Sequence, residues 1–200
     1  MSVMDKAVET EPSLTINAHA LDLTDERFFH LCRDNRDLRL ELNAQGELII
    51  MGPTTTETGR RNAKLNQRLA NWTEQDNTGE CFDSSAGFTL PNGAKVSPDA
   101  SWVRRNRYEA LTTEEREQFA PICPDFVVEL RSKTDRLARL QARMVEYIEN
   151  GAQLGWLLDP AARRVYIYRP GRAVETLDAP ETIAGDPVLP GFVLQLREIW

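Results

Sequence analysis

The chain has few of the residues from which disulfide frameworks, zinc sites and imidazole catalysis are built. Its 200 residues include three cysteines, Cys32, Cys81 and Cys123, and two histidines, His19 and His30. The cysteines are far apart and form no Cys-x-x-Cys pair, so we expect no disulfide framework and no structural zinc site, but reduced and inert thiols. The histidines have no metal-ligand spacing, and we expect surface or helix residues rather than catalytic bases.

Long apolar runs and the common catalytic motifs are also missing. No stretch approaches the ~20 consecutive apolar residues of a membrane span, and the N-terminus has no basic segment followed by an apolar one. We therefore expect a cytoplasmic protein that does not bind membranes. The chain also lacks Gly-x-x-x-x-Gly-Lys-Ser/Thr, Gly-x-Gly-x-x-Gly, Gly-x-Ser-x-Gly and His-Glu-x-x-His, which argues against the enzyme classes that these motifs mark.

An excess of positive charge is missing as well. The formal net charge is −7, the wrong sign for a protein that holds nucleic acid by bulk electrostatics. The basic residues nevertheless gather in three segments, which contain Arg60, Arg61, Lys64 and Arg68; Arg104, Arg105 and Arg107; and Arg131, Lys133, Arg136, Arg139 and Arg143. A local positive surface can therefore coexist with a negative total, although ordinary solvated helix faces would give the same clusters.

What the chain does contain fits one globular domain. With 41% hydrophobic and 28% charged residues, it is long enough to bury a core of its own. Residues 1–20 carry little apolar periodicity and are predicted to be a loose arm, so the domain is expected over residues 21–200.

Periodicity and turn signals divide this domain into alternating strands and helices. A helix is expected after Thr24, then a hairpin over residues 38–51, and then a helix to about residue 75 that begins with the capping-box sequence Thr54-Thr55-Thr56-Glu57. Short strands are expected over 79–82, 87–90 and 95–103, and a polar helical stretch over 107–119. A strand over 124–131, a helix capped by Thr134 or Asp135, a hairpin over 154–169 and a final strand follow. This order predicts one α/β or α+β domain.

The strand over residues 124–131 carries the most informative chemistry. Alternation places Asp125, Val127, Glu129 and Arg131 on one face, and apolar side chains on the other. Asp99, in the segment Ser97-Pro98-Asp99, supplies a second strand carboxylate a short way before it. Two neighbouring carboxylates can hold a hard divalent cation through oxygen ligands, which favours metal-assisted hydrolysis.

These residues resemble a known family in order and spacing. The resemblance runs from about residue 21 to residue 200 and is carried by Glu57 at a helix start, Ser97-Pro98-Asp99, Pro124-Asp125-Phe-Val-Val-Glu129-Leu-Arg-Ser132, Leu140-Gln-Ala-Arg143-Met-Val-Glu-Tyr147-Ile-Glu-Asn-Gly151 and Leu154-Gly-Trp-Leu-Leu-Asp159-Pro160. The chain resembles the Uma2 (Uma-two) family of restriction-endonuclease-like proteins. That family is similar to the PD-(D/E)XK nuclease superfamily, whose members hold one or two Mg²⁺ ions on a central sheet and hydrolyse phosphodiester bonds.

The resemblance implies a restriction-endonuclease-like domain, with a mixed central sheet flanked by helices, that binds Mg²⁺, or Mn²⁺ in its place, and DNA. It makes Asp99 and Glu129 the metal ligands, together with a backbone carbonyl such as that of Leu130. In the alternative interpretation, Asp99 caps a turn and Glu129 pairs with an arginine. Glu57 matches a helix acid that can reach the metal, but it is equally a capping-box partner of Thr54. Asp125, at the start of its strand, is expected to have a turn role.

The chain departs from the family pattern at the basic catalytic position. The motif places a lysine where this chain has Arg131, and close relatives often carry one on the next helix, where this chain has Arg143. Arginine can stabilise a phosphate but stays protonated, so it cannot act as a base. Lys133 would lie roughly 13 Å from Glu129 along an extended strand, too far for direct contact. On the helix, Arg143 should share an edge with Arg136, Arg139 and Tyr147, whereas Gln141 should point away.

We therefore expect a Mg²⁺-dependent endonuclease acting on DNA, in which Asp99 and Glu129 bind the metal and Arg131 and Arg143 stabilise phosphate charge. A homodimer is compatible with this assignment. The rival hypothesis is a catalytically degenerate relative that binds nucleic acid or a protein partner through the same basic edges. A third hypothesis is an assembly protein, which an exposed strand edge at residues 164–169 would favour.

Overall fold

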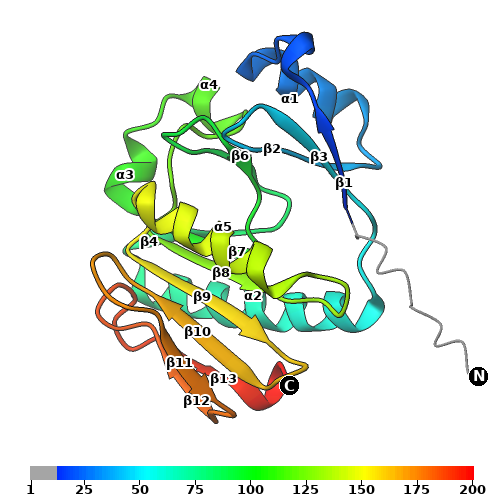
Figure 1. Cartoon of the computed structure of the whole chain (residues 1–200). Helices are drawn as coiled ribbons and strands as arrows, with labels where there is room; N and C mark the ends of the chain where they lie inside the picture. Colours follow the sequence, from blue (N-terminus) through cyan, green and yellow to red (C-terminus); the bar gives the residue numbers. More distant parts are fainter. Residues whose placement is uncertain (1–12) are drawn as a thin grey trace, which may run out of the picture.

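Two β-sheets frame the molecule in a computed structural model that describes residues 13–200 (Figure 1). The first sheet has the strand order β1-β3-β2-β6-β5, and every neighbouring pair is antiparallel. Its members are β1 (Ser13–Asn17), β2 (Arg39–Leu42), β3 (Glu47–Met51), β5 (Phe88–Thr89) and β6 (Lys95–Val96). The short helix η1 (His19–Leu21) and α1 (Asp25–Asp34) follow β1, and Phe28 of α1 packs on Leu40 and Leu42 of this sheet. The expected hairpin over residues 38–51 is confirmed as β2 and β3.

The second sheet is the mixed central sheet that the sequence predicts. Its order is β11-β10-β9-β8-β7-β4, and only the central pair β8 and β9 is parallel. The strands are β4 (Gly79–Asp83), β7 (Ala100–Arg104), β8 (Phe126–Leu130), β9 (Leu154–Asp159), β10 (Arg164–Tyr168) and β11 (Glu175–Asp178). A parallel pair needs a crossover connection, and α5 (Leu137–Glu149) supplies it between β8 and β9.

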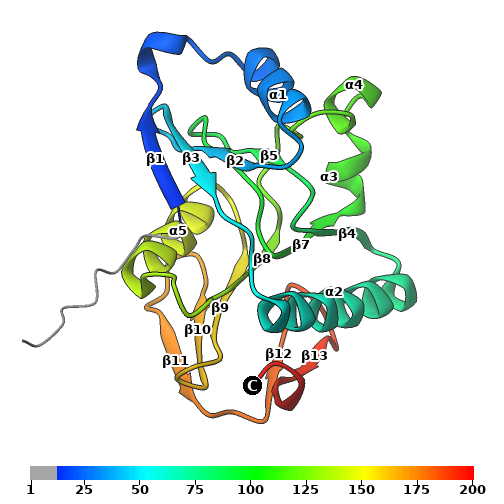
Figure 2. The same cartoon turned by 90° about the vertical axis from the view of Figure 1, so that its right-hand side faces the viewer.

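Two long helices cover opposite faces of this central sheet, as Figure 2 shows for α2 (Thr56–Asp76) and α5. Leu65 and Leu69 of α2 pack in one core cluster with Phe126 and Val128 of β8. Val127 of β8 belongs to a second cluster, which contains Met144 and Tyr147 of α5. The alternation predicted for this strand is therefore confirmed, and Glu129 lies on the face that α5 covers.

The remaining elements close the two ends of the core. Two short helices, α3 (Arg105–Glu109) and α4 (Thr113–Arg116), occupy the stretch predicted to be helical between β7 and β8. The hairpin of β12 (Thr182–Ala184) and β13 (Val193–Gln195), followed by η2 (Leu196–Glu198), completes the cluster under α2. Within the described residues, no helix has the length and apolar character needed to cross a membrane.

The predicted strand over residues 95–103 is interrupted, and the interruption positions the site. β6 ends at Val96 in the first sheet, and β7 begins at Ala100 in the second. Pro98 lies in the segment that connects the two strands. Proline has no N–H to donate, and no strand pairing requires one in this segment. Asp99 therefore lies where the chain passes from one sheet to the other.

The N-terminal arm differs from the prediction as far as the structure describes it. Residues 13–17 form β1, which pairs with β3 in a register that places Leu14 opposite Ile50. The alternation of polar and apolar residues in Ser13-Leu14-Thr15-Ile16-Asn17 is a short strand signal, which the prediction of a loose arm missed. Residues 1–12 of the predicted arm lie outside the described residues.

Three local predictions are also corrected. The N-cap of α2 is Thr55, whose side chain accepts from the Thr58 N–H, so Thr54 and Glu57 form no capping box. Neither Thr134 nor Asp135 caps α5, because the helix begins one residue later and Asp135 instead accepts from the Ser132 N–H at 2.7 Å. The segment at residues 164–169 is no exposed edge, because β11 covers β10.

The cysteines are free thiols, as expected. Burial raises the pKa of Cys32 to about 11 and that of Cys123 to about 12. Thiols with such pKa values stay protonated at neutral pH and are poor nucleophiles.

Candidate active site

A cavity of about 760 Å³ brings Asp99 and Glu129 together. Its walls come from β2, the start of α2, the end of β8 with the loop that follows, and α5. Seven basic and four acidic side chains line it: Arg39, Arg61, Arg131, Lys133, Arg136, Arg139 and Arg143, and Glu57, Asp99, Glu129 and Asp135. The cavity is therefore locally positive in a chain whose net charge is −7.

Asp99 is a buried carboxylate fixed from three directions. Its Oδ2 accepts from the backbone N–H of Leu130 at 2.8 Å, and its Oδ1 accepts from Asn62 Nδ2 at 3.1 Å. Asn66, one turn further along α2, donates to the Asp99 carbonyl at 3.0 Å, and Arg39 Nη1 is 3.8 Å from Asp99 Oδ1. Burial raises the pKa of Asp99, and the guanidinium of Arg39 is the largest opposing influence.

Glu129 is buried on the α5 face of β8. Its Oε1 accepts from the Tyr147 hydroxyl at 2.9 Å and lies 3.5 Å from Arg143 Nη1. Burial raises the pKa of Glu129 to about 7; Arg143 opposes the shift, and the negative charges of Asp99 and Glu41 add to it. Burial, followed by the charge of Glu129, also holds the pKa of Tyr147 well above its usual range, so its hydroxyl remains a donor.

Glu41 on β2 is a third buried carboxylate at this site, and sequence reasoning missed it. Both of its oxygens accept from Arg143, Oε1 from Nη1 at 3.3 Å and Oε2 from Nη2. Burial opposes the charged form of Arg143, but Glu41 and then Glu129 outweigh it and hold the arginine pKa well above its usual range. Arg143 is therefore a permanent cation shared unequally by two carboxylates.

Side chains of β2 also form hydrogen bonds with the backbone of Ser97, two residues before Asp99. Glu41 Oε1 accepts from the Ser97 N–H at 3.1 Å, and Arg39 Nη2 donates to the Ser97 carbonyl. Arg39 and Glu41 lie two residues apart in a strand, so they share a face. Two opposite charges at this spacing in an otherwise apolar strand were the available signal, but the sequence does not show which residues they meet.

Two residues with predicted roles are held by other partners. Arg131 Nη1 donates to Asp159 at 2.6 Å, and its Nε donates to the carbonyl of Asp135 at 3.1 Å. Glu57 is half exposed and pairs with Arg60 at 2.7 Å and Arg61 at 3.1 Å. Both Arg131 and Glu57 line the cavity, but their recorded contacts are to these neighbours rather than to Asp99 or Glu129.

Asp125 has the structural role predicted for it. At the opposite end of β8, its side chain accepts from the Arg104 N–H at 2.9 Å and pairs with Arg107 at 2.9 Å. Its carbonyl accepts from the N–H groups of Gln153 and Leu154 at the start of β9. Asp125 therefore ties two loops to the sheet.

The donor set fits a small divalent cation. Within residues 13–200, no three His, Cys, Asp or Glu side chains gather as a metal cluster. Mg²⁺ does not require one, because it commonly keeps several waters and binds one or two carboxylates together with substrate phosphates. Asp99 and Glu129 both face one cavity, and burial raises the pKa of both, so their carboxylates are the oxygen ligands that the site could offer to such a cation.

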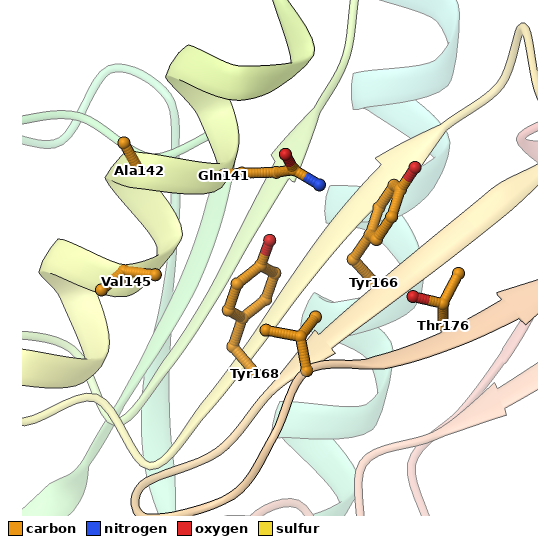
Figure 3. Close-up of a pocket in the computed structure, with 7 residues that line it drawn as sticks. Gln141, Ala142, Val145, Tyr166, Tyr168 and Thr176 are labelled. Atoms are coloured by element: carbon orange, nitrogen blue, oxygen red, sulfur yellow. The ribbon is translucent and has the colours of Figure 1, made fainter.

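A second cavity, of about 400 Å³, lies between α5 and the strands β10 and β11 (Figure 3). Gln141 points into it, beside the hydroxyl groups of Tyr166 and Tyr168. The prediction that Gln141 points away from the Arg143 side of the helix is therefore confirmed. No acidic side chain lines this second cavity, so its lining offers no carboxylate for a metal.

Comparison with known proteins places this chain in a family. A crystal structure of a "putative nuclease belonging to DUF820" from Anabaena variabilis superposes with a TM-score of 0.68 at 20% sequence identity, covering 80% of this chain and 88% of that one. At this identity the likeness concerns the fold, and it confirms the predicted nuclease-like architecture. No curated protein matches the chain at a significant level. The model of the Uma2 family, described as "Putative restriction endonuclease", matches residues 25–197, so the chain belongs to the Uma2 family.

Proposed function

We propose that this protein is a Mg²⁺-dependent nuclease that hydrolyses phosphodiester bonds of DNA, with Asp99 and Glu129 as the metal ligands. The observation that carries the proposal is the pair of buried carboxylates that face one basic cavity. Membership of a family described as restriction endonucleases supports the reaction class.

The chain prepares the two ligands in different ways. The Leu130 N–H and the amides of Asn62 and Asn66 fix the position of Asp99, and the Tyr147 hydroxyl fixes Glu129. The carbonyl oxygen of Leu130 is a further candidate ligand. It points to the same edge of β8 as the Leu130 N–H, which donates a hydrogen bond to Asp99. A divalent cation bound by these oxygens would lower the pKa of a water molecule and neutralise charge on the scissile phosphate.

Basic side chains on the cavity wall account for phosphate binding. Arg39, Lys133 and Arg139 line the cavity, and no ion pair to a carboxylate closer than 3.8 Å is recorded for them within the described chain. Arginine and lysine bind phosphate oxygens through charge-assisted hydrogen bonds. Arg131 and Arg143 contribute positive charge at the wall, although each is already paired with a carboxylate.

The second candidate function is binding without turnover. The observation in its favour is that both places where related nucleases carry a lysine hold arginines, each committed to an ion pair: Arg131 with Asp159, and Arg143 with Glu41. An arginine cannot take a proton from an attacking water. A protein of this kind would hold DNA in the same cavity and leave its phosphodiester bonds intact.

One experiment separates the two candidates. Purified wild-type protein, Asp99→Ala, Glu129→Ala and Arg143→Lys are incubated with plasmid and with single-stranded DNA in Mg²⁺ or Mn²⁺. The proposal predicts cleavage by the wild type and its loss by at least about a hundredfold in both alanine variants, because each removes a ligand. Cleavage that survives both changes would refute the site assignment. No cleavage by the wild type, with activity in Arg143→Lys, would establish the degenerate site.

DNA binding in the same samples is compared between Lys133→Glu and Arg172→Glu. Both changes shift the net charge equally, but Lys133 lines the cavity and Arg172 does not. Binding in the cavity predicts a loss of roughly tenfold for Lys133→Glu and little change for Arg172→Glu. Equal losses would place the DNA elsewhere.

A further inference from the structure

We propose that Glu41 is a positioning residue, which holds Arg143 off Glu129 and thereby keeps Glu129 available to a cation. The inference rests on the proposed metal site and adds a residue to it. Glu41 comes from β2 of the first sheet, whereas Glu129 and Arg143 come from the central sheet and its crossover helix. The site therefore takes its charge balance from an element outside the nuclease motif.

The contacts of Arg143 are asymmetric. Two of its nitrogens donate to the two oxygens of Glu41, whereas only Nη1 approaches Glu129, at 3.5 Å. The paired geometry is the stronger one, because two parallel charge-assisted bonds fix both groups. The Ser97 N–H, 3.1 Å from Glu41 Oε1, fixes the carboxylate in turn. The position of Arg143 is therefore set mainly by Glu41, and its contact with Glu129 is a single, longer one.

Burial makes this balance consequential. Glu41 is fully buried, and the Arg143 side chain is 13% exposed, so solvent screens their charges weakly. A buried guanidinium cannot lose its proton and requires a carboxylate partner. With Glu41 neutralised, Glu129 is the carboxylate among residues 13–200 that keeps an ion-pair contact with Arg143, at 3.5 Å. Arg143 would then pair with Glu129 through both nitrogens and cover the oxygens that a cation needs.

The test is a double-variant cycle that measures Mn²⁺ binding to the full chain by electron paramagnetic resonance. Glu41→Gln is compared with wild type, and the double variant with Arg143→Met alone. We expect Glu41→Gln to weaken Mn²⁺ binding about tenfold when Arg143 is present, and less than about threefold after Arg143→Met. Equal losses in both backgrounds would show that Glu41 acts only as a distant negative charge, and would overturn the proposal.

Glu57→Gln is the matched control. It removes the same negative charge at a residue that lines the cavity, but Glu57 pairs with Arg60 and Arg61 rather than with Arg143. We expect Mn²⁺ affinity within about twofold of wild type. A loss as large as that of Glu41→Gln would contradict a specific role for Glu41.

If Glu41→Gln does not fold, Glu41→Asp retains the charge but shortens the side chain, and the proposal predicts a smaller loss of Mn²⁺ affinity in the same direction.

A crystal structure of metal-free Glu41→Gln tests the same idea without a cation. The proposal expects both terminal nitrogens of Arg143 to contact the carboxylate of Glu129. An Arg143 that stays beside position 41 would refute it. This result decides the role of Glu41 even if the wild type binds no Mn²⁺, an outcome that would count against the proposed metal site alone.

Discussion

Three buried carboxylates converge at the site, and the way that each is neutralised sets its chemistry. Glu41 has a full arginine partner, Asp99 has two hydrogen-bond donors and a guanidinium 3.8 Å away, and Glu129 has a tyrosine hydroxyl and a partial share of Arg143. Buried charges are expensive unless they are paired. Glu129 therefore lacks a full cationic partner, and burial raises its pKa to about 7.

Cation affinity should consequently depend on pH. Burial raises the pKa of Glu129 to about 7, so a metal-free site holds a proton there at lower pH, and a cation must displace it. The apparent affinity for Mn²⁺ should fall about tenfold for each pH unit below 7 and stay level above it. Isothermal titration calorimetry at a series of pH values measures this slope. An affinity unchanged from about pH 6 to pH 8 would contradict an exchange of proton for metal at Glu129.

At the scale of elements, each wall of the site combines a structural and a functional face. α2 buries Leu65 and Leu69 in the core and turns Asn62 and Asn66, one helical turn apart, toward Asp99. α5 carries Tyr147 and Arg143, one turn apart, toward Glu129. The packing of α2 and α5 on the central sheet therefore orients their polar side chains toward Asp99 and Glu129.

The packing of β4 against β7 can be tested with Gly79, and Gly59 of α2 serves as the contrast. A Cβ added at Gly79 of β4 would come well within 3.0 Å of the Trp102 ring and the Val103 carbonyl, whereas one added at Gly59 of α2 meets nothing within 4 Å. Gly79→Ala should lower the free energy of unfolding by about 1–3 kcal/mol through overpacking. Gly59→Ala should raise it by roughly 0.5–1 kcal/mol, because alanine favours the helix. Urea denaturation measures both. Equal effects would mean that the close approach of Gly79 to Trp102 is not maintained.

The sequence predicts helices and strands better than it predicts which residues of different helices and strands are in contact. Period-two alternation correctly predicted that Glu129 lies on one face of β8, and Phe126 and Val128 on the other. This holds even in a strand that is buried on both faces, because successive side chains always point to opposite faces. The role of Glu41 could not be read, because its partners, Ser97 and Arg143, are 56 and 102 residues away in the chain. Asp99 was noticed as a second strand carboxylate near Glu129, and the family resemblance then implied that it binds metal. Its position between two sheets depends on pairings that local patterns do not encode.

The same limit explains the predictions at basic residues. Arg131 and Arg143 were assigned to phosphate because of their place in the motif. In the fold, each meets a carboxylate from another element, Asp159 of β9 and Glu41 of β2. Buried or half-buried arginines require such partners. Which partner each one meets follows from the tertiary arrangement alone.

At the scale of the whole molecule, the two sheets are joined by the segment that carries Asp99, one of the two proposed metal ligands. The chain leaves the first sheet after β6, passes through Asp99 and enters the central sheet at β7, while β2 holds Ser97 by both its N–H and its carbonyl. The central sheet supplies Glu129, the segment that leads into it supplies Asp99, and the first sheet supplies Arg39 and Glu41. The result is a positive cavity in an acidic protein.

The central claim, that Asp99 and Glu129 together bind a divalent cation, is tested most directly by anomalous diffraction from crystals soaked in Mn²⁺. The account predicts a peak within about 2.0–2.6 Å of a carboxylate oxygen of both residues, and no peak there in Asp99→Ala. No peak in the cavity of the wild type, or a peak that persists after Asp99→Ala, would contradict it.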